Sequence, residues 1–266
     1  KKTAESHENS GVSAVLSFHY CQRQDNITAR LASDIFPLRL VRGKDLGYNY
    51  RIGPQHNEID KCETEEQDMK RIGMLTSGGD CQALNAAMRG VVKTLANSRE
   101  KVEIYGFLDG YKGLIYSNFQ MLTGKDFSGI LTKGGTILGT SRTPFKTIHE
   151  PDDNGVDKVE SMKQTYHKLQ LDCLVILGGN GTHKTANLLR EEGLNVVTLP
   201  KTIDNDLWGT DMTFGFQSAV NIATDAIDCI HTTAASHGRV FIVEVMGHKV
   251  GWLTLNAGMA GGEFTI

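Results

Sequence analysis

Apolar and polar residues follow two different periods along the chain from residue 71 onward. Short apolar runs that end in turns predict strands over 72–76, 102–107, 173–177, 196–199 and 240–245, and the start of a last strand over 264–266. Apolar residues at helical spacing predict helices over 82–96, 156–169, 182–192, 216–235 and 251–259. Because strands that alternate with helices form a parallel sheet covered by helices, we predict an α/β fold. It is a doubly wound, mostly parallel sheet with flanking helices, followed by the start of a second α/β domain.

The first 68 residues differ from the rest of the chain. All eight methionines lie at or after Met69, which favours Met69 as the natural start. Residues 58–68 are rich in Glu and Asp and have no apolar period, as is typical of a solvated linker. We expect residues 1–68 to be an extension or linker outside the folded domains, which we place at 69–215 and 216–266.

Composition excludes several classes of partner. Lys and Arg number 28 against 31 Asp and Glu, so the formal net charge of −3 gives no broad positive field for nucleic acid or an anionic membrane surface. The longest apolar runs are far below the ~20 residues that a membrane-spanning helix needs. Five cysteines, odd in number and widely spaced, indicate reduced thiols and a cytoplasmic location.

Two glycine-rich turns follow predicted strands, at the edge of a parallel sheet where ligands bind. In Ser77-Gly-Gly-Asp80 the glycines let the backbone approach a ligand, and the helix start offers N–H groups to an anion. An ordinary tight turn explains this segment equally well. Gly178-Gly-Asn-Gly-Thr182, with Thr182 expected as the N-cap, has more glycines than a plain turn needs and favours phosphate binding. It matches neither the P-loop nor the GxGxxG pattern.

A third turn, residues 200–206, carries two carboxylates after a strand. Asp204 and Asp206 can divide the work of general base and metal ligand, and Mg²⁺ commonly uses one or two carboxylates together with substrate phosphates. The alternative is a turn rich in Asx residues with no catalytic role. Since all three turns lie at strand ends of one predicted sheet, together they predict phosphoryl transfer.

Residues 69–266 resemble the phosphofructokinase family. Six ordered blocks carry the resemblance, LTSGGDCQALNAAMRG at 75–90, GGTILGTSR at 134–142, LGGNGT at 177–182, PKTIDND at 200–206, SHGR at 236–239 and EVMG at 244–247. The resemblance implies the glycolytic transfer of a phosphoryl group from ATP to the 1-hydroxyl of fructose 6-phosphate. It makes 69–215 the nucleotide-phosphate domain and 216–266 the beginning of a truncated sugar-phosphate domain.

The resemblance also implies a role for individual residues. The residues that would hold the ATP phosphates are Gly79, Arg142, Thr143, Gly179, Asn180, Gly181 and Thr182. Those implied for the sugar phosphate are Thr202, Asp204, Arg239, Met246, Gly247 and His248. Thr202, Asp204 and Arg142 would be catalytic, with Asp204 as the base and Arg142 spreading charge on the transferred group, which its planar fork suits. Asp206 and Asn180 would serve Mg²⁺, although the family commonly has Asp where this chain has Asn180.

Two residues bear on the donor. Pyrophosphate-using members of the family resemble this chain at Lys201 but carry Asp at the position of Gly181, whereas ATP users have Gly there. We expect ATP, because a carboxylate at 181 would repel an α-phosphate. A pyrophosphate-dependent phosphotransferase and a non-catalytic nucleotide-binding protein stay open as alternatives. The Arg of SHGR, here Arg239, is similar to one that reaches a neighbouring subunit, which implies a homo-oligomer, a dimer or tetramer.

Overall fold

The computed structural model describes residues 69–98 and 100–262, so the predicted extension over 1–68 and the predicted strand over 264–266 lie outside the described residues. The strands are β1 (Lys70–Ser77), β2 (Val102–Phe107), β3 (Phe119–Leu122), β4 (Cys173–Gly178), β5 (Val196–Thr202) and β6 (Phe214–Gly215). The helices are α1 (Ala83–Ala96), α2 (Tyr111–Ile115), the 3-10 helix η1 (Phe145–Thr147), α3 (Lys158–Lys168), α4 (Asn180–Glu191), α5 (Phe216–His237) and α6 (Trp252–Gly261).

The strands form one six-stranded sheet in the order β3-β2-β1-β4-β5-β6. Every pairing is parallel except that of β2 with β3. At the carboxyl edge, Ser77 of β1 pairs with Gly178 of β4, which in turn pairs with Pro200 of β5. The predicted fold class is therefore confirmed, and the three turns singled out in the sequence emerge side by side.

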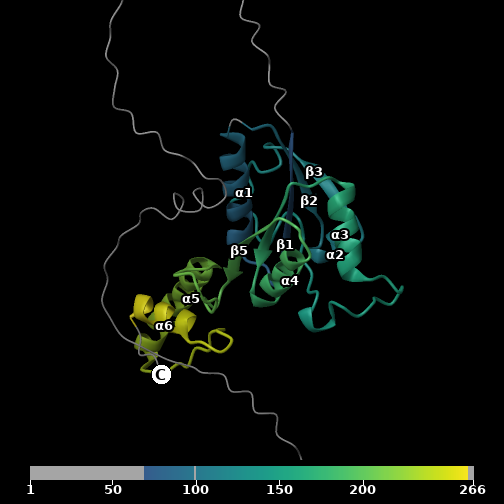
Figure 1. Cartoon of the computed structure of the whole chain (residues 1–266). Helices are drawn as coiled ribbons and strands as arrows, with labels where there is room; N and C mark the ends of the chain where they lie inside the picture. The colour runs from purple at the N-terminus through teal and green to yellow at the C-terminus, as the bar shows by residue number, and fades with distance from the viewer. Residues whose placement is uncertain (1–68, 99, 263–266) are drawn as a thin grey trace, which may run out of the picture.

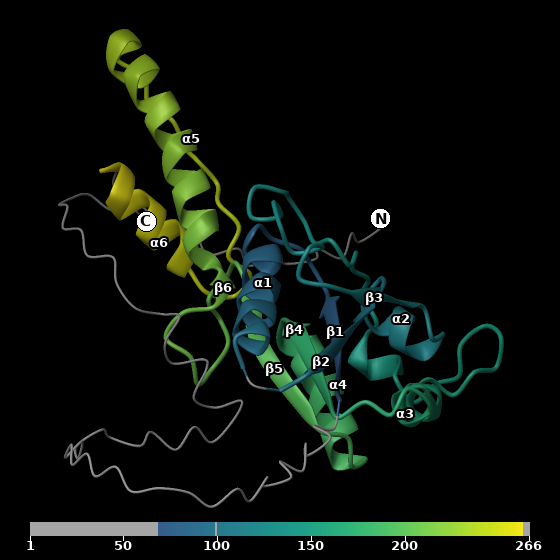
Figure 2. The same ribbon diagram turned by 90° about the horizontal axis from the view of Figure 1, so that it is seen from above.

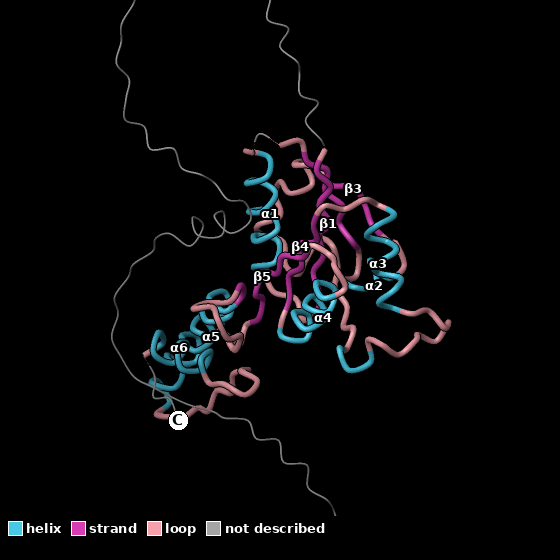
Figure 3. The backbone as a smooth tube through the Cα atoms, in the orientation of Figure 1, coloured by secondary structure: helices cyan, strands magenta, loops and turns pink. Residues whose placement is uncertain are grey.

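Helices cover both faces of the sheet, with α1 on one side and α2, α3 and α4 on the other (Figure 1). Side chains of successive strand residues point to opposite faces, so Met74 joins the buried cluster under α1 while Leu75 joins the cluster under the other three helices. A long connection leads from β3 to α3, with η1 as its only helical part (Figure 3). It contributes Phe127, Ile130 and Leu138 to the cluster under α1 and Ile148 to the other cluster. The sheet thus separates two buried cores.

Helices α5 and α6 pack against each other and project away from the β6 end of the sheet (Figure 2). Their buried cluster is small, consisting of Phe216, Val220 and Leu253. None of the described helices is both long and apolar enough to cross a membrane. Because its buried cluster is so small, this pair of helices is attached to the sheet over a short contact.

The strand predicted over 240–245 is wrong for the described residues. Residues 238–251 form no strand, and the side chains of Val240 and Ile242 are each 94% exposed. A strand requires a partner for its backbone N–H and C=O groups, and no described strand lies beside this segment. Residues 240–245 therefore have the apolar pattern of a strand but no described strand to pair with.

Other predicted elements differ at their ends. The helix predicted from 182 begins at Asn180, with Gly179 as its N-cap, so the expectation that Thr182 caps it is wrong. Strand β5 continues through Pro200 to Thr202, three residues past the predicted end. The sequence prediction also missed α2 and β3, which are five and four residues long and too short to show a period.

Candidate active site

A cleft of about 620 Å³ lies at the carboxyl ends of β1, β4 and β5. The chain leaves β1 toward β2 on one side and returns to β4 on the other, which makes this the switch point where open α/β sheets bind ligands. The cleft brings together the predicted residues Gly79, Arg142, Thr143, Gly179, Asn180, Gly181, Thr182, Lys201, Thr202, Asp204, Asp206, Met246 and His248.

Two predicted residues are not part of the lining of this cleft. Arg239 follows the C-terminal end of α5, and a 22-residue helix places it roughly 33 Å from the start of that helix. Gly247 lies between two residues that do line the cleft, Met246 and His248. Within one chain, therefore, the structure gathers the predicted donor residues but only part of the predicted sugar-phosphate set.

The turn after β1 is fastened to the segment that leads to Arg142. Gly78 has a φ of 90°, which favours glycine, and its N–H donates to the Ser141 carbonyl at 3.0 Å. The Thr140 hydroxyl donates to the Gly78 carbonyl at 2.7 Å. A Cβ at Gly79 would have no neighbour within 4 Å, so this backbone faces open space in the cleft.

The N-terminus of α4 forms the second wall. Its first N–H groups have no partner within the helix and carry the positive end of the helix dipole, which is an arrangement that binds anions. A Cβ at Gly178 would lie 2.4 Å from the Thr182 hydroxyl, so packing requires glycine there. A Cβ at Gly181 would have no neighbour within 4 Å, so glycine at 181 leaves room in the cleft itself.

Two side chains, the buried Tyr111 and the half-buried His183, connect the first turn of α4 to the structure around it. The Tyr111 hydroxyl donates to the Thr182 carbonyl at 2.8 Å, and burial raises the pKa of this phenol. A ring nitrogen of His183 lies 2.9 Å from the Gly178 carbonyl, and burial lowers the pKa of this imidazole below its usual value. Both groups therefore stay neutral near pH 7. Tyr111 contacts the backbone of α4, and His183, which is itself part of α4, contacts the backbone at the end of β4.

The third turn holds the two carboxylates. The Asp204 N–H donates to the Thr202 hydroxyl at 3.1 Å, and that hydroxyl donates to the Asp204 carboxylate at 3.2 Å. Asn205 has a φ of 54°, and its side chain accepts from the Thr213 N–H at 2.9 Å. The segment is thus an Asx-rich turn, as the alternative interpretation held, and the same turn directs Asp204 and Asp206 into the cleft.

Lys201 is a buried cation at the floor of the cleft, with 6% of its surface exposed. Its Nζ donates to the Gly79 carbonyl, and so connects β5 to the turn after β1. Burial lowers the pKa of this ammonium more than the nearby Asp80 and Asp204 carboxylates raise it. The sequence suggested its charge but not this contact.

The described part of the chain contains no cluster of three or more His, Cys, Asp or Glu side chains that could hold a metal ion alone. Mg²⁺ does not need one, because it keeps water and phosphate oxygens and uses one or two carboxylates. Asp204, Asp206 and the Asn180 amide all line the cleft and are hard oxygen donors. The residues present therefore fit Mg²⁺ brought with a phosphate ligand.

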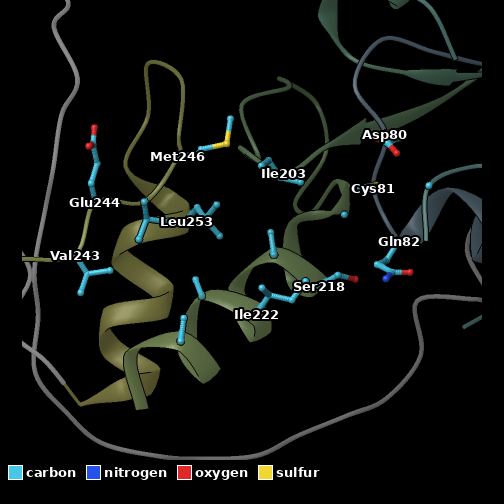
Figure 4. Close-up of a pocket in the computed structure, with 16 residues that line it drawn as sticks. Asp80, Cys81, Gln82, Ile203, Ser218, Ile222, Val243, Glu244, Met246 and Leu253 are labelled. Carbon is cyan, nitrogen blue, oxygen red and sulfur yellow. The ribbon is translucent and has the colours of Figure 1, made fainter. Parts of the chain in front are cut away.

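A second hollow, of about 510 Å³, adjoins the cleft and shares Asp80, Ile203 and Met246 with it. Its wall is mainly apolar and comes from α5, α6 and the segment before α6, as Ile222, Leu253 and Val243 show in Figure 4. Ile222 is 61% exposed. We call this hollow the α5 groove.

Sequence reasoning missed several residues of the cleft and its support. Phe145 and Pro144 line the cleft directly after the predicted Arg142 and Thr143. The supporting residue Tyr111 is apolar in pattern, and no sequence signal indicates that its hydroxyl would reach α4. Only their position just after the block that ends at Arg142 could have indicated Pro144 and Phe145.

Comparison with known proteins places the chain among its relatives. The family model described as Phosphofructokinase matches residues 71–266. An ATP-dependent 6-phosphofructokinase of Spirochaeta thermophila is 61% identical over 73% of this chain and 53% of its own length. The ATP-dependent 6-phosphofructokinase 3 of Bacteroides thetaiotaomicron is 54% identical over 72% of this chain and 56% of its own. A pyrophosphate–fructose 6-phosphate 1-phosphotransferase of Amycolatopsis mediterranei is 46% identical over 74% and 55%.

A solved structure agrees with these matches. Phosphofructokinase from Saccharomyces cerevisiae superposes with a TM-score of 0.62 at 33% identity, over 71% of this chain and 28% of that one. The chain spans about half the length of the curated relatives that it matches. The match falls on the N-terminal part of those relatives.

Proposed function

The chain belongs to the phosphofructokinase family, and on that premise we propose that it serves ATP-dependent transfer of a phosphoryl group to the 1-hydroxyl of fructose 6-phosphate. The observation that carries the proposal is the meeting of three elements at one switch point. They are the open turn at Gly79, the N-terminus of α4, and the carboxylates of Asp204 and Asp206. Anion-binding backbone beside a carboxylate pair is what transfer from a phosphate donor to an alcohol requires.

In the proposed mechanism Asp204 is the general base. Its carboxylate accepts the proton of the attacking hydroxyl, while the hydrogen bond from Thr202 fixes the orientation of the carboxylate. Arg142 lines the same cleft, and its planar fork suits two oxygens of the transferred group. Asp206 and the Asn180 amide would hold Mg²⁺, which would supply positive charge to neutralise the phosphates.

ATP is the proposed donor because of the space at Gly181. A nucleotide extends beyond its two terminal phosphates, and the open position at 181 leaves room for that extension. Pyrophosphate is the alternative donor, and Lys201 favours it because a buried cation with a single carbonyl contact suits a small, highly charged anion. The 46%-identical relative from Amycolatopsis mediterranei is named for pyrophosphate.

Fewer residues of this chain support the sugar-phosphate part of the proposed site. Met246 and His248 reach the cleft, whereas Arg239 lies at the far end of α5. We propose that Arg239 serves the site of a neighbouring copy, which makes the protein a homo-oligomer, and that the reaction is glycolytic and cytoplasmic. Light scattering that reports only monomers, in the presence of donor and sugar phosphate, would contradict the oligomer.

A coupled assay tests the proposed reaction. Two proteins are compared, this 266-residue chain and the same chain joined to the remaining C-terminal part of the Spirochaeta thermophila relative. ATP and pyrophosphate are offered separately with Mg²⁺ and fructose 6-phosphate, and equilibrium binding of each donor is measured alongside. We expect transfer from ATP in the joined protein, with kcat/KM well above that for pyrophosphate.

Each other outcome selects an alternative. A kcat/KM for pyrophosphate equal to or above that for ATP would favour the pyrophosphate-dependent reaction. Binding of Mg·ATP by both proteins with no transfer by either would favour a non-catalytic nucleotide-binding protein. Failure of both proteins to bind either donor would overturn the proposed function.

A further inference from the structure

The segment 133–141 brings Arg142 to the cleft but has no regular secondary structure. It contains three glycines, at 134, 135 and 139, whose backbones lose more freedom on ordering than other residues do. Gly139 has a φ of 66°, which favours glycine, and a Cβ there would lie 2.6 Å from the Asp109 carboxylate. Side chains outside the segment must therefore fix its path.

Asn85 of α1 is one of these side chains and is wholly buried. Its amide nitrogen donates to the Lys133 carbonyl at 3.1 Å, and its amide oxygen accepts from the Ile137 N–H at 2.9 Å. One side chain thus holds both ends of a five-residue stretch. Because it is buried, removal leaves backbone groups without a partner and out of reach of water.

Thr76, at the end of β1, is a second side chain that fixes the path of segment 133–141, and it is also wholly buried. Its hydroxyl donates to the Gly139 carbonyl at 2.8 Å and lies 3.0 Å from the Thr136 hydroxyl. The next two residues after Gly139, Thr140 and Ser141, are bonded to Gly78. The segment is therefore fastened along its length to α1 and to the edge that carries the donor site.

Nothing comparable holds the side chain of Arg142. Among the described residues no hydrogen bond or ion pair is recorded for its guanidinium. Its place in the cleft depends on the backbone that precedes it. We propose that Asn85 and Thr76 are positioning residues that hold segment 133–141 so that Arg142 faces the donor phosphates, an inference that rests on the function proposed above.

A double-mutant cycle measured by calorimetric binding of Mg·ATP to the 266-residue chain tests this role. We expect Arg142→Ala to weaken binding about 30-fold, within the range for hydrogen bonds to charged groups. Asn85→Ala should weaken it about tenfold in the unmodified chain and less than about twofold when Arg142 is already Ala, because coupled residues are not additive. Asn195→Ala is the matched control.

Asn195 also donates its amide to a backbone carbonyl, that of Asp172 at 2.8 Å, but it precedes β5 at the opposite edge of the sheet. Its loss should lower the melting temperature without changing binding. If Asn85→Ala does not fold, Thr76→Val carries the same cycle, since it removes one hydroxyl with little change of shape. An equal loss from Asn85→Ala or Thr76→Val in both Arg142 backgrounds, or no loss at all, would overturn the positioning role alone. No binding of Mg·ATP or Mg·pyrophosphate by the unmodified chain would instead contradict the proposed function, and this inference with it.

Discussion

The carboxyl edge of the sheet and the α5–α6 pair differ in how completely the chain itself determines them. At the edge, Gly78, Thr182 and Thr202 are each tied to a neighbouring segment by hydrogen bonds within this chain. In the α5–α6 region, Val240 and Ile242 are almost fully exposed. The donor residues, Thr202 and Asp204 thus occupy a fixed frame, whereas the other proposed sugar-phosphate residues, which come from the segment between α5 and α6, lie on a surface that makes fewer contacts.

This difference accounts for which predicted residues meet. Gly79, residues 179–182 and Asp204 come from turns whose strands are neighbours, so sheet register brings these residues together. Arg142 and Thr143 come instead from the connection that Asn85 and Thr76 hold. Arg239 is separated from the cleft by the full length of α5, and no register relates it to the sheet. Two of the predictions below compare matched positions in the two regions, and the other two test the fixed edge alone.

The largest effect is expected at Asp204. Asp204→Asn removes the proposed base at the fixed edge, so kcat in the joined protein should fall by about 10²- to 10⁴-fold, with little change in sugar-phosphate affinity. Asp225→Asn makes the same chemical change on the exposed α5 and should alter kcat by less than about twofold. A fall in kcat of less than about tenfold for Asp204→Asn would show that Asp204 is not the general base.

The next effect is expected at Gly181. At ~4 Å and an effective dielectric near 20, two like charges repel by roughly 4 kcal/mol before screening, so Gly181→Asp should weaken Mg·ATP binding by at least about 100-fold. Gly181→Asn has the same size without the charge, and the open space at 181 accommodates either side chain. If Asn weakens binding as much as Asp does, bulk rather than charge governs the position.

A stability comparison separates the two regions without reference to activity. Met88 on α1 is fully buried and Met259 on α6 is 49% exposed. Met88→Ala should lower the free energy of unfolding by about 2–5 kcal/mol through lost burial and a cavity, and Met259→Ala by less than about 1 kcal/mol. Urea unfolding curves measure both. Equal losses would mean that the α5–α6 pair is as well packed as the sheet.

The smallest effect is expected from the pH dependence at Lys201. Burial lowers its pKa in the folded state, so the folded state binds fewer protons than the unfolded state as the pH approaches 10.5. The unmodified chain should therefore gain stability relative to Lys201→Met as the pH rises from 7 to 10. Urea unfolding at the two pH values checks this, and a difference between the proteins that does not change with pH would contradict it.

The sequence predicted the fold well wherever one period and one turn determine an element. The runs around Met74 and Val175 and the glycines after them suffice to place β1, β4 and the donor turns. It could not predict that Lys201 would bond to Gly79, or Asn85 to Lys133, because these pairs are 122 and 48 residues apart in the chain. It wrongly predicted a strand at 240–245, where an apolar pattern lacks a partner.

In the proposed site, the fixed edge of the sheet holds the donor phosphates by itself. Hydrogen exchange with and without saturating Mg·ATP tests it most directly, because exchange reports protection along the whole backbone. We expect Mg·ATP to slow exchange at residues 77–81, 140–143 and 179–183, with little change over 239–262. Protection confined to α5, α6 and the segment between them, with the three turns unchanged, would contradict it.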